Sequence, residues 1–278
     1  SMNIEMTTIT PPMAALLLGN NGANRKLNKR HVDFLADQIK SGKWQKNGQT
    51  IVIAKDGTLM DGQHRLTAIV AANVPVDMGL CTGAPRASMP TIDNGKPRSS
   101  ADVLTMSKCS YATLVAASIH LLYKFDNESL ATNGTGGGTK MPNSVVMPAL
   151  KDIQARVDLD WLAKIVQKTG RNTRMKVSNL FVAFYLIASK YGEGIVTRFA
   201  EKMNDGGDYP KSPTLVMPQI IARIHASGRS PHRAYDLAML LAGFDRWIEH
   251  KKMSQYRESS VVNDIQEFTK TYNTHIRW

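Results

Sequence analysis

A stretch centred on residue 60 constrains the fold most, because the spacing of its apolar residues changes at a turn. Thr50-Ile51-Val52-Ile53-Ala54 is typical of a buried strand, and Lys55-Asp56-Gly57 predicts a turn into a short strand around Leu59. Asp61-Gly62 is a second turn signal. The residues from Gln63 to Ala72 then follow helical spacing. This stretch predicts a β-hairpin that leads directly into a helix.

The turn between hairpin and helix carries an acid, an imidazole and a guanidinium within five residues. His64 and Arg65 fall in the first turn of the predicted helix, where backbone N–H groups and the helix dipole favour an anion. Arg65 adds a planar cation that suits phosphate oxygens. Residues 61–65 therefore predict a phosphate-binding turn, in which Gly62, Gln63, His64 and Arg65 hold the phosphates. An ordinary strand–turn–helix with exposed polar residues is the alternative.

The first hundred residues read as a small α/β unit. Thr10-Pro11-Pro12 predicts the start of a short helix that ends at Leu18. Asn28 predicts the cap of a second helix to Ile39, with Val32, Leu35, Ala36 and Ile39 on its apolar face. After the helix at 63–72, Val74–Cys81 reads as a strand.

A second polar cluster follows between residues 91 and 100. Lys96 and Arg98 supply positive charge that could close over a bound anion, and Asp93 could hold a metal ion. Ser99 or Ser100 predicts the cap of a helix at 101–106. A solvated loop is the alternative interpretation.

From residue 101 onward the apolar spacing is helical, which predicts an all-α domain at 101–278 behind an α/β domain at 1–100. Together they give an α+β chain. Residues 127–143 are rich in Gly, Ser, Thr and Asn, and predict a flexible insert. Four basic residues at a helix junction could contact phosphate or form a solvated charge run: Lys168, Arg171, Arg174 and Lys176. Helices are predicted at about 110–125 (with Leu114, Ala117, Ser118, Leu121 and Leu122 on one face), 144–155, 158–169, 176–190, 192–204, 215–227, 231–250 and 260–272.

The net charge narrows the class of partner. The 278 residues carry a formal charge of +12, with +5 in residues 1–100 and +7 in residues 151–278. Such a balance suits a polyanion such as DNA, or an anionic nucleotide. We find neither a membrane-spanning run nor a signal peptide, and the lone Cys81 and Cys109 suit a reducing cytoplasm. The sequence does not fix the oligomeric state, and a homodimer stays open.

Five segments of the first hundred residues resemble the ParB/sulfiredoxin superfamily, and within it the ParB N-terminal-like proteins of phages and mobile elements. Asp-Gly-Gln-His-Arg is the most specific of them. The segments are Asn24-Arg25-Lys26-Leu27, Gly42-Lys43-Trp44, Gly48-Gln49-Thr50-Ile51, Asp61-Gly62-Gln63-His64-Arg65-Leu66-Thr67-Ala68 and Asp93-Asn94-Gly95-Lys96-Pro97-Arg98-Ser99.

The resemblance implies a nucleotide-binding domain, because ParB proteins bind and hydrolyse CTP, sulfiredoxins use ATP and a related serine kinase uses ADP. By position, Gly62, His64 and Arg65 match the phosphate turn of the superfamily, and Arg25 matches its upstream basic residue. The chain departs from sulfiredoxins because Gln63 replaces their Cys. It departs from the partition proteins because the turn reads Gln-His-Arg in place of Glu-Arg-Arg, with no clear helix-turn-helix or dimerising tail.

These observations lead to one main hypothesis and three alternatives. The main hypothesis is a ParB-like protein that binds ATP or CTP with Mg²⁺ and binds or acts on DNA. Under this hypothesis His64 acts as a general acid or base, and Asp61 binds Mg²⁺ or activates a hydroxyl group. The alternatives are a phosphotransferase on a small molecule or modified base, a nuclease with a metal site formed by Asp61, His64 and Asp93, and a non-enzymatic DNA-binding adaptor.

Overall fold

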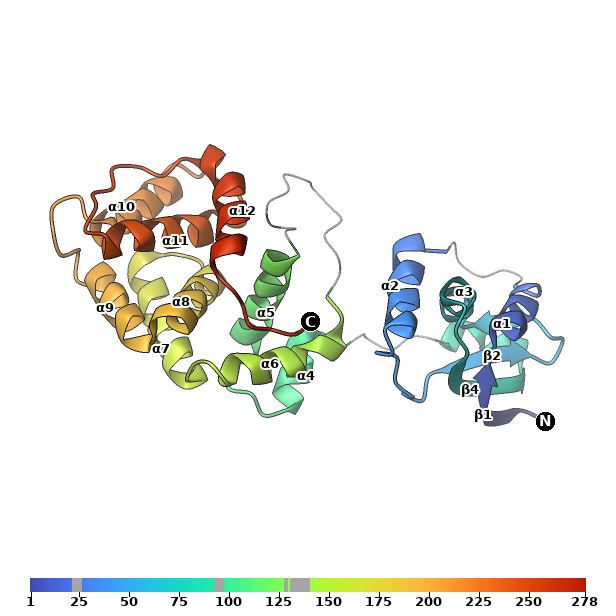
Figure 1. Cartoon of the computed structure of the whole chain (residues 1–278). Coiled ribbons are helices and arrows are strands. Elements are labelled where there is room, and N and C mark those ends of the chain that lie inside the picture. The colour runs from blue at the N-terminus through green and yellow to red at the C-terminus, as the bar shows by residue number, and fades with distance from the viewer. Residues whose placement is uncertain (22–26, 93–97, 128–129, 131–140) are drawn as a thin grey trace. The chain divides into compact units, whose positions relative to one another are not determined.

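The computed structural model describes residues 1–21, 27–92, 98–127, 130 and 141–278. The chain divides into two compact units, Ser1–Pro97 and Arg98–Trp278 (Figure 1). A small mixed sheet with helices forms the first unit, and helices form the described part of the second. This confirms the predicted α+β class, with the change of structure close to residue 100. Among the described residues, no helix is long and apolar enough to cross a membrane.

The first unit is built on a four-stranded sheet in the order β1-β4-β2-β3. β1 (Asn3–Ile9) pairs antiparallel with β4 (Val76–Ala84), and β2 (Thr50–Ala54) lies parallel to β4 on its other side. β3 (Leu59–Asp61) pairs antiparallel with β2, as the predicted hairpin requires. The chain leaves this hairpin at Asp61 and enters a helix within two residues, so the sheet fixes where that helix begins.

Three helices and a 3-10 turn complete the first unit: α1 (Pro11–Leu18), α2 (Lys29–Lys40), α3 (Gln63–Ala72) and η1 (Arg86–Thr91). The side chains of Thr10 and Asn28 accept N–H groups of the first turns of α1 and α2, as predicted for helix caps. The predicted bounds of α3 and β2 are confirmed. Leu66 and Ile69 of α3 are fully buried and pack in one core with Ile51 of β2.

The sequence prediction missed β1. Met2 precedes the strand, and Ile4 and Met6 alternate along it, but all three are exposed, so this alternation does not mark a face buried in the core. The strand forms because its whole length pairs with β4, a partner some seventy residues away in sequence. The predicted strand at 74–81 is shifted, because β4 runs two residues later at its start and three residues later at its end.

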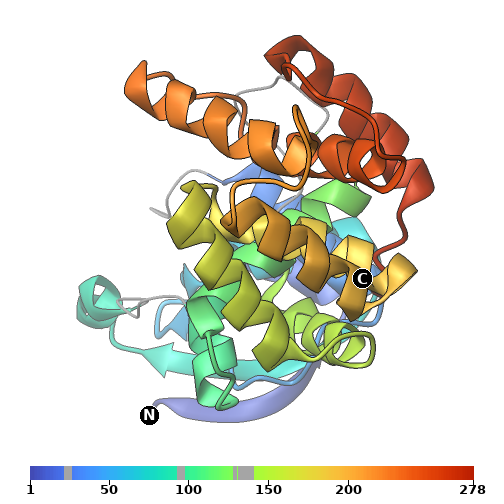
Figure 2. The same ribbon diagram turned by 90° about the vertical axis from the view of Figure 1, so that its left-hand side faces the viewer.

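The second unit begins with α4 (Ser100–Met106), where Ser99 and Asp102 form a capping box. Its predicted helices are present with shifts of a few residues at their ends. Figure 2 views this unit face on, with the orange and red helices of residues 213–271 together at the top. The remaining elements are α5 (Ala112–Asp126), η2 (Asn143–Val145), α6 (Val146–Gln154), α7 (Leu159–Thr173), α8 (Val177–Tyr191), α9 (Glu193–Asn204), α10 (Pro213–Ala226), α11 (Tyr235–Ile248), η3 (Glu258–Ser260) and α12 (Val261–Thr271).

The core of the second unit surrounds α8, whose residues from Asn179 to Ala188 are all buried. The predicted apolar face of α5 was partly wrong. Ser118 and Leu122 are buried, but Ala117 is exposed, and Val115 and Ile119 are buried in its place. The helix packs against α4, α6, α8 and α12, so burial extends around more of its circumference than a single stripe.

Residues 272–278 fold back over the start of this unit. The Trp278 Nε1–H donates to an Asp126 carboxylate oxygen at 2.6 Å, and the Thr274 hydroxyl donates to the same carboxylate. The Arg277 N–H donates to Asp152 of α6 at 3.0 Å. Burial raises the pKa of Asp126 above its usual range, although these hydrogen bonds oppose the rise. The segment thereby ties α5 and α6 to the last helix.

Candidate functional site

The start of α3 is fixed by the backbone of Gly62, the N-cap residue. Gly62 has φ 108°, a left-handed conformation that L side chains rarely adopt. A Cβ placed there would lie 2.3 Å from Ile51 Cδ1 on the neighbouring strand β2. Glycine therefore lets the first turn of α3 lie directly against β2, and the turn predicted at Asp61-Gly62 is present.

The first turn of α3 has two features that favour an anion. Amides in the first turn of a helix have no partner within the helix, and Gly62 has no side chain that could cap them. The positive end of the helix dipole lies at the same point. Gln63 and His64 in this turn are both buried, so the turn is set into the protein.

The starts of α2 and α3 meet at this corner. The backbone N–H of Asn28, the N-cap of α2, donates to His64 Nε2 at 3.0 Å. The rings of His31 and His64 lie 5.3 Å apart between centroids. The Asn21 side chain, just past α1, donates to Gln63 Oε1 at 3.1 Å. Two helix N-termini thus lie within one side-chain length of each other.

His64 acts as a hydrogen-bond acceptor in this arrangement. An imidazolium has no lone pair, so Nε2 can accept the Asn28 N–H only while it carries no proton. The same bond fixes the ring against the start of α2. A role of His64 as acid or base stays a prediction, and it would require Nε2 to leave its backbone donor.

Asp61 and Arg65 form an ion pair across the turn. Arg65 Nη2 lies 2.7 Å from Asp61 Oδ2, and the two side chains are 12% and 29% exposed. The residues are four apart, which is the spacing that brings side chains together at a helix start. Arg65 still has other N–H donors beyond the one that Asp61 accepts. A phosphate at the turn would meet a guanidinium already oriented by a carboxylate.

The structure gives no position relative to this corner for the other predicted site residues. Arg25, Asp93 and Lys96 lie outside the described residues. Arg98 belongs to the second unit, where its carbonyl accepts the Asn143 side chain at 2.8 Å. Across the described ranges no three His, Cys, Asp or Glu side chains gather in a way that could hold a metal ion. The metal roles predicted for Asp61 and Asp93 stay predictions.

The predicted basic junction at residues 168–176 is described in full. Lys168, Arg171, Arg174 and Lys176 are all exposed at the end of α7 and the start of α8. The Lys176 N–H donates to the buried Asp236 carboxylate at 2.8 Å, which fixes this junction against α11. The four side chains can therefore face a large anion from a rigid backbone.

Sequence reasoning missed two residues that shape the corner, Asn21 and Asn28. Asn28 was predicted as a helix cap, and its side chain does cap α2, but its backbone N–H also orients His64. That contact joins residues far apart in sequence and had no local signal. No family model matches this chain, and neither the curated proteins nor the solved structures contain a protein that matches it.

Proposed function

We propose that the first unit binds the phosphates of a nucleotide, ATP or CTP with Mg²⁺, at the start of α3, and that the protein binds or acts on DNA. The observation that carries the proposal is the meeting of two helix N-termini at one corner, joined by the bond from the Asn28 N–H to His64. Both dipoles present their positive ends there.

The side chains around the corner favour the same ligand. Arg65 is held by Asp61 and keeps N–H donors for a second acceptor. Arg30, in the first turn of α2, is exposed and adds a cation. Lys29 beside it is also exposed, but it pairs with Asp33 at 3.0 Å. A triphosphate carries several negative charges, so it suits a site with this balance. The resemblance of residues 61–68 to the phosphate turn of the ParB/sulfiredoxin superfamily supports the same proposal.

The DNA part of the proposal is supported by charge. The chain carries +12, and the second unit exposes basic side chains such as those of the 168–176 junction. Contacts between such side chains and DNA phosphates release counterions, so the affinity should fall steeply as salt rises.

Calorimetric titration of the whole protein with ATP, CTP and GTP, each with Mg²⁺, tests the nucleotide part. We expect one of them to bind, and Arg65→Ala to weaken binding about tenfold or more because a charged hydrogen bond to phosphate is lost. Arg86→Ala is the matched control. Arg86 lies in the same unit and pairs with Asp56, in the turn between β2 and β3, at 3.0 Å, with both side chains exposed.

Arg65→Lys distinguishes the loss of a phosphate contact from a folding defect, because it keeps the positive charge beside Asp61 and removes only the planar guanidinium. Binding weaker than that of the parent, with an unchanged unfolding midpoint, supports a direct contact. Absence of binding by all three nucleotides, or equal binding by the parent and both Arg65 variants, overturns the proposal.

A further inference from the structure

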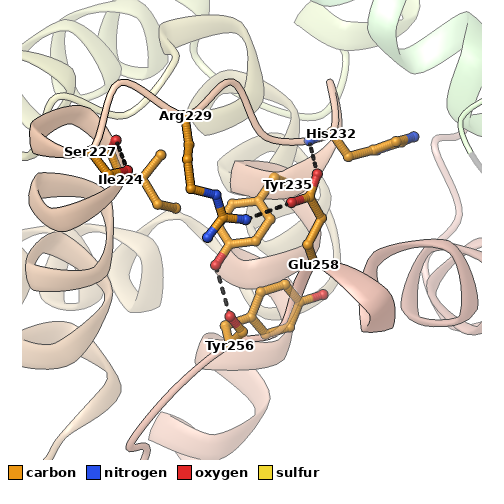
Figure 3. Close-up of polar contacts among 7 residues, drawn as sticks. All are labelled: Ile224, Ser227, Arg229, His232, Tyr235, Tyr256 and Glu258. Carbon is orange, nitrogen blue, oxygen red and sulfur yellow. Dashed lines mark hydrogen bonds and ion pairs between the residues drawn. The ribbon is translucent and has the colours of Figure 1, made fainter.

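The second unit contains an open groove between the end of α10 and the segment before α12. Its volume is about 610 Å³, and three arginines line it: Arg223, Arg229 and Arg257. We call it the arginine groove. Ser227, Ser254 and Ser259 add hydroxyl groups to the lining. Figure 3 shows Arg229 extending from the loop after α10 toward Glu258, above Tyr235 and Tyr256.

Positive charge exceeds negative charge in this groove. Glu258 is its one lining carboxylate, and its two oxygens accept the Arg229 Nη2–H at 2.9 Å and the His232 N–H at 2.8 Å. Arg223 donates only its Nε–H, to the Gln219 carbonyl at 3.3 Å. Within the described chain, neither Arg223 nor Arg257 has a carboxylate at ion-pair distance, so both guanidinium forks can serve an outside acceptor.

The floor of the groove is rigid. The buried Tyr235 donates its hydroxyl to the Tyr256 carbonyl at 2.8 Å, and Tyr256 donates to Asp264 of α12 at 2.7 Å. Burial raises the pKa of Tyr235, and burial together with Asp264 raises that of Tyr256. Both phenols therefore stay uncharged, and they leave the arginines to set the sign of the groove.

The 168–176 junction contacts the same helix, α10, that contributes Arg223 to the groove. His225, near the end of α10, lies with Nε2 3.2 Å from the carbonyl oxygen of Arg174, which caps α7. Arg223 lies two residues before His225 on α10, so the two side chains leave the helix on different sides. The groove and the junction are therefore two separate basic surfaces of the second unit.

We infer that the arginine groove binds the phosphodiester backbone of DNA. Arginine forks and serine hydroxyls are the groups that contact phosphate oxygens, and they carry no sequence information by themselves. The arginines come from separate segments and are exposed along an open groove, so a long polyanion fits them better than a small anion. The inference rests on the DNA part of the proposed function and assigns it a surface.

Fluorescence anisotropy of a short labelled duplex with the whole protein, over a salt series, tests the inference. Each of Arg223→Ala, Arg229→Ala and Arg257→Ala should weaken binding about fivefold and lower the salt slope by about one, since each removes one phosphate contact. Arg156→Ala is the control. This exposed arginine follows α6, which Figure 1 places at the opposite end of the unit from α10.

Glu258→Gln gives the sharper result, because it should increase affinity. The change removes a negative charge and frees Arg229, while the amide oxygen can still accept the His232 N–H. We expect duplex binding to tighten about threefold to tenfold at low salt. A gain of this kind cannot come from loss of folding.

The possible failures are distinct. If the parent binds duplex and all four groove variants bind it equally well, the surface assignment is wrong and the proposed DNA binding stands. If the parent binds no duplex under any salt condition, both fail, and binding of a labelled poly-glutamate peptide would then assign the groove to acidic protein segments. The nucleotide titration at Arg65 is independent of either result.

Discussion

At the start of α3 the polar and charged groups are set into the protein, whereas in the arginine groove they face solvent. The Arg65 side chain is 12% exposed and that of Arg229 is 61% exposed, although each pairs with one carboxylate at a similar distance. Buried groups interact strongly but tolerate only one arrangement, and exposed ones interact weakly and adapt. The first corner suits a small anion of fixed shape, and the groove suits a flexible polymer.

The largest expected effect is the loss of stability when a glycine with a positive φ is replaced at the start of α3. Gly62→Ala forces a side chain into a left-handed position and against Ile51, so it should destabilise the first unit by about 2–4 kcal/mol and abolish nucleotide binding. Hydrogen exchange of peptides from residues 50–80, read by mass spectrometry, measures this.

The matched control lies beside the arginine groove, between its lining residues Ser227 and Arg229. Gly228 also has a positive φ, of 66°, but a Cβ there would meet nothing within 4 Å. Gly228→Ala should cost only about 1 kcal/mol and leave duplex binding unchanged. If the Gly62→Ala and Gly228→Ala proteins were equally protected from hydrogen exchange, the start of α3 would not depend on the backbone conformation of Gly62. The contrast between the two regions would then be lost.

The next effect separates the two ion pairs. Asp61→Asn leaves the Arg65 guanidinium largely buried without its carboxylate, and should cost about 1–3 kcal/mol of unfolding free energy. Glu258→Gln breaks a pair of similar length on the surface, and should cost about 0–1 kcal/mol. Urea unfolding of the two variants compares them, and an equal loss in both would contradict the difference in burial.

The smallest effect concerns histidines, which also differ between the units. His120 Nε2 in the second unit lies 3.0 Å from the Ser100 hydroxyl, and burial followed by the charge of Lys124 lowers the pKa of His120 below 6.5. The unfolded chain then takes up a proton first. The contribution of His120 to stability is therefore complete above pH 6.5. It is lost as the pH falls toward the pKa that His120 has in the folded protein.

Urea unfolding followed by circular dichroism at several pH values between about 7.5 and 5.5 measures the loss. We expect His120→Gln to reduce the pH dependence by a small amount, because the imidazole is only half buried. If the unfolding free energy of His120→Gln depends on pH as steeply as that of the parent, groups other than His120 cause the loss of stability.

Local signals gave most of the fold. The bounds of α3 were predicted because Gly62 and the spacing of Leu66 and Ile69 are properties of a short segment. β1 was missed because its side chains do not alternate between buried and exposed positions. Its pairing with β4 joins residues that are far apart in sequence. The face of α5 was partly wrong because several helices cover it, which the spacing of one helix cannot reveal.

The candidate sites were predictable to different degrees. The residues of the α3 turn are consecutive, so their chemistry could be read directly, and the four-residue spacing of Asp61 and Arg65 would have allowed their pairing to be predicted. The arginine groove had no such signal. Arg223 and Arg257 are separated by α11 in sequence and share a surface only because α10 and the segment before α12 lie together.

The return of residues 272–278 to α5 has a consequence for synthesis. The Asp126 carboxylate is made long before Thr274 and Trp278, the two side chains that donate hydrogen bonds to it. Until those residues have left the ribosome, Asp126 lacks both of these donors. The contacts that join α5 and α6 to residues 272–278 can therefore form only after Trp278 has been translated, so this part of the unit is completed last.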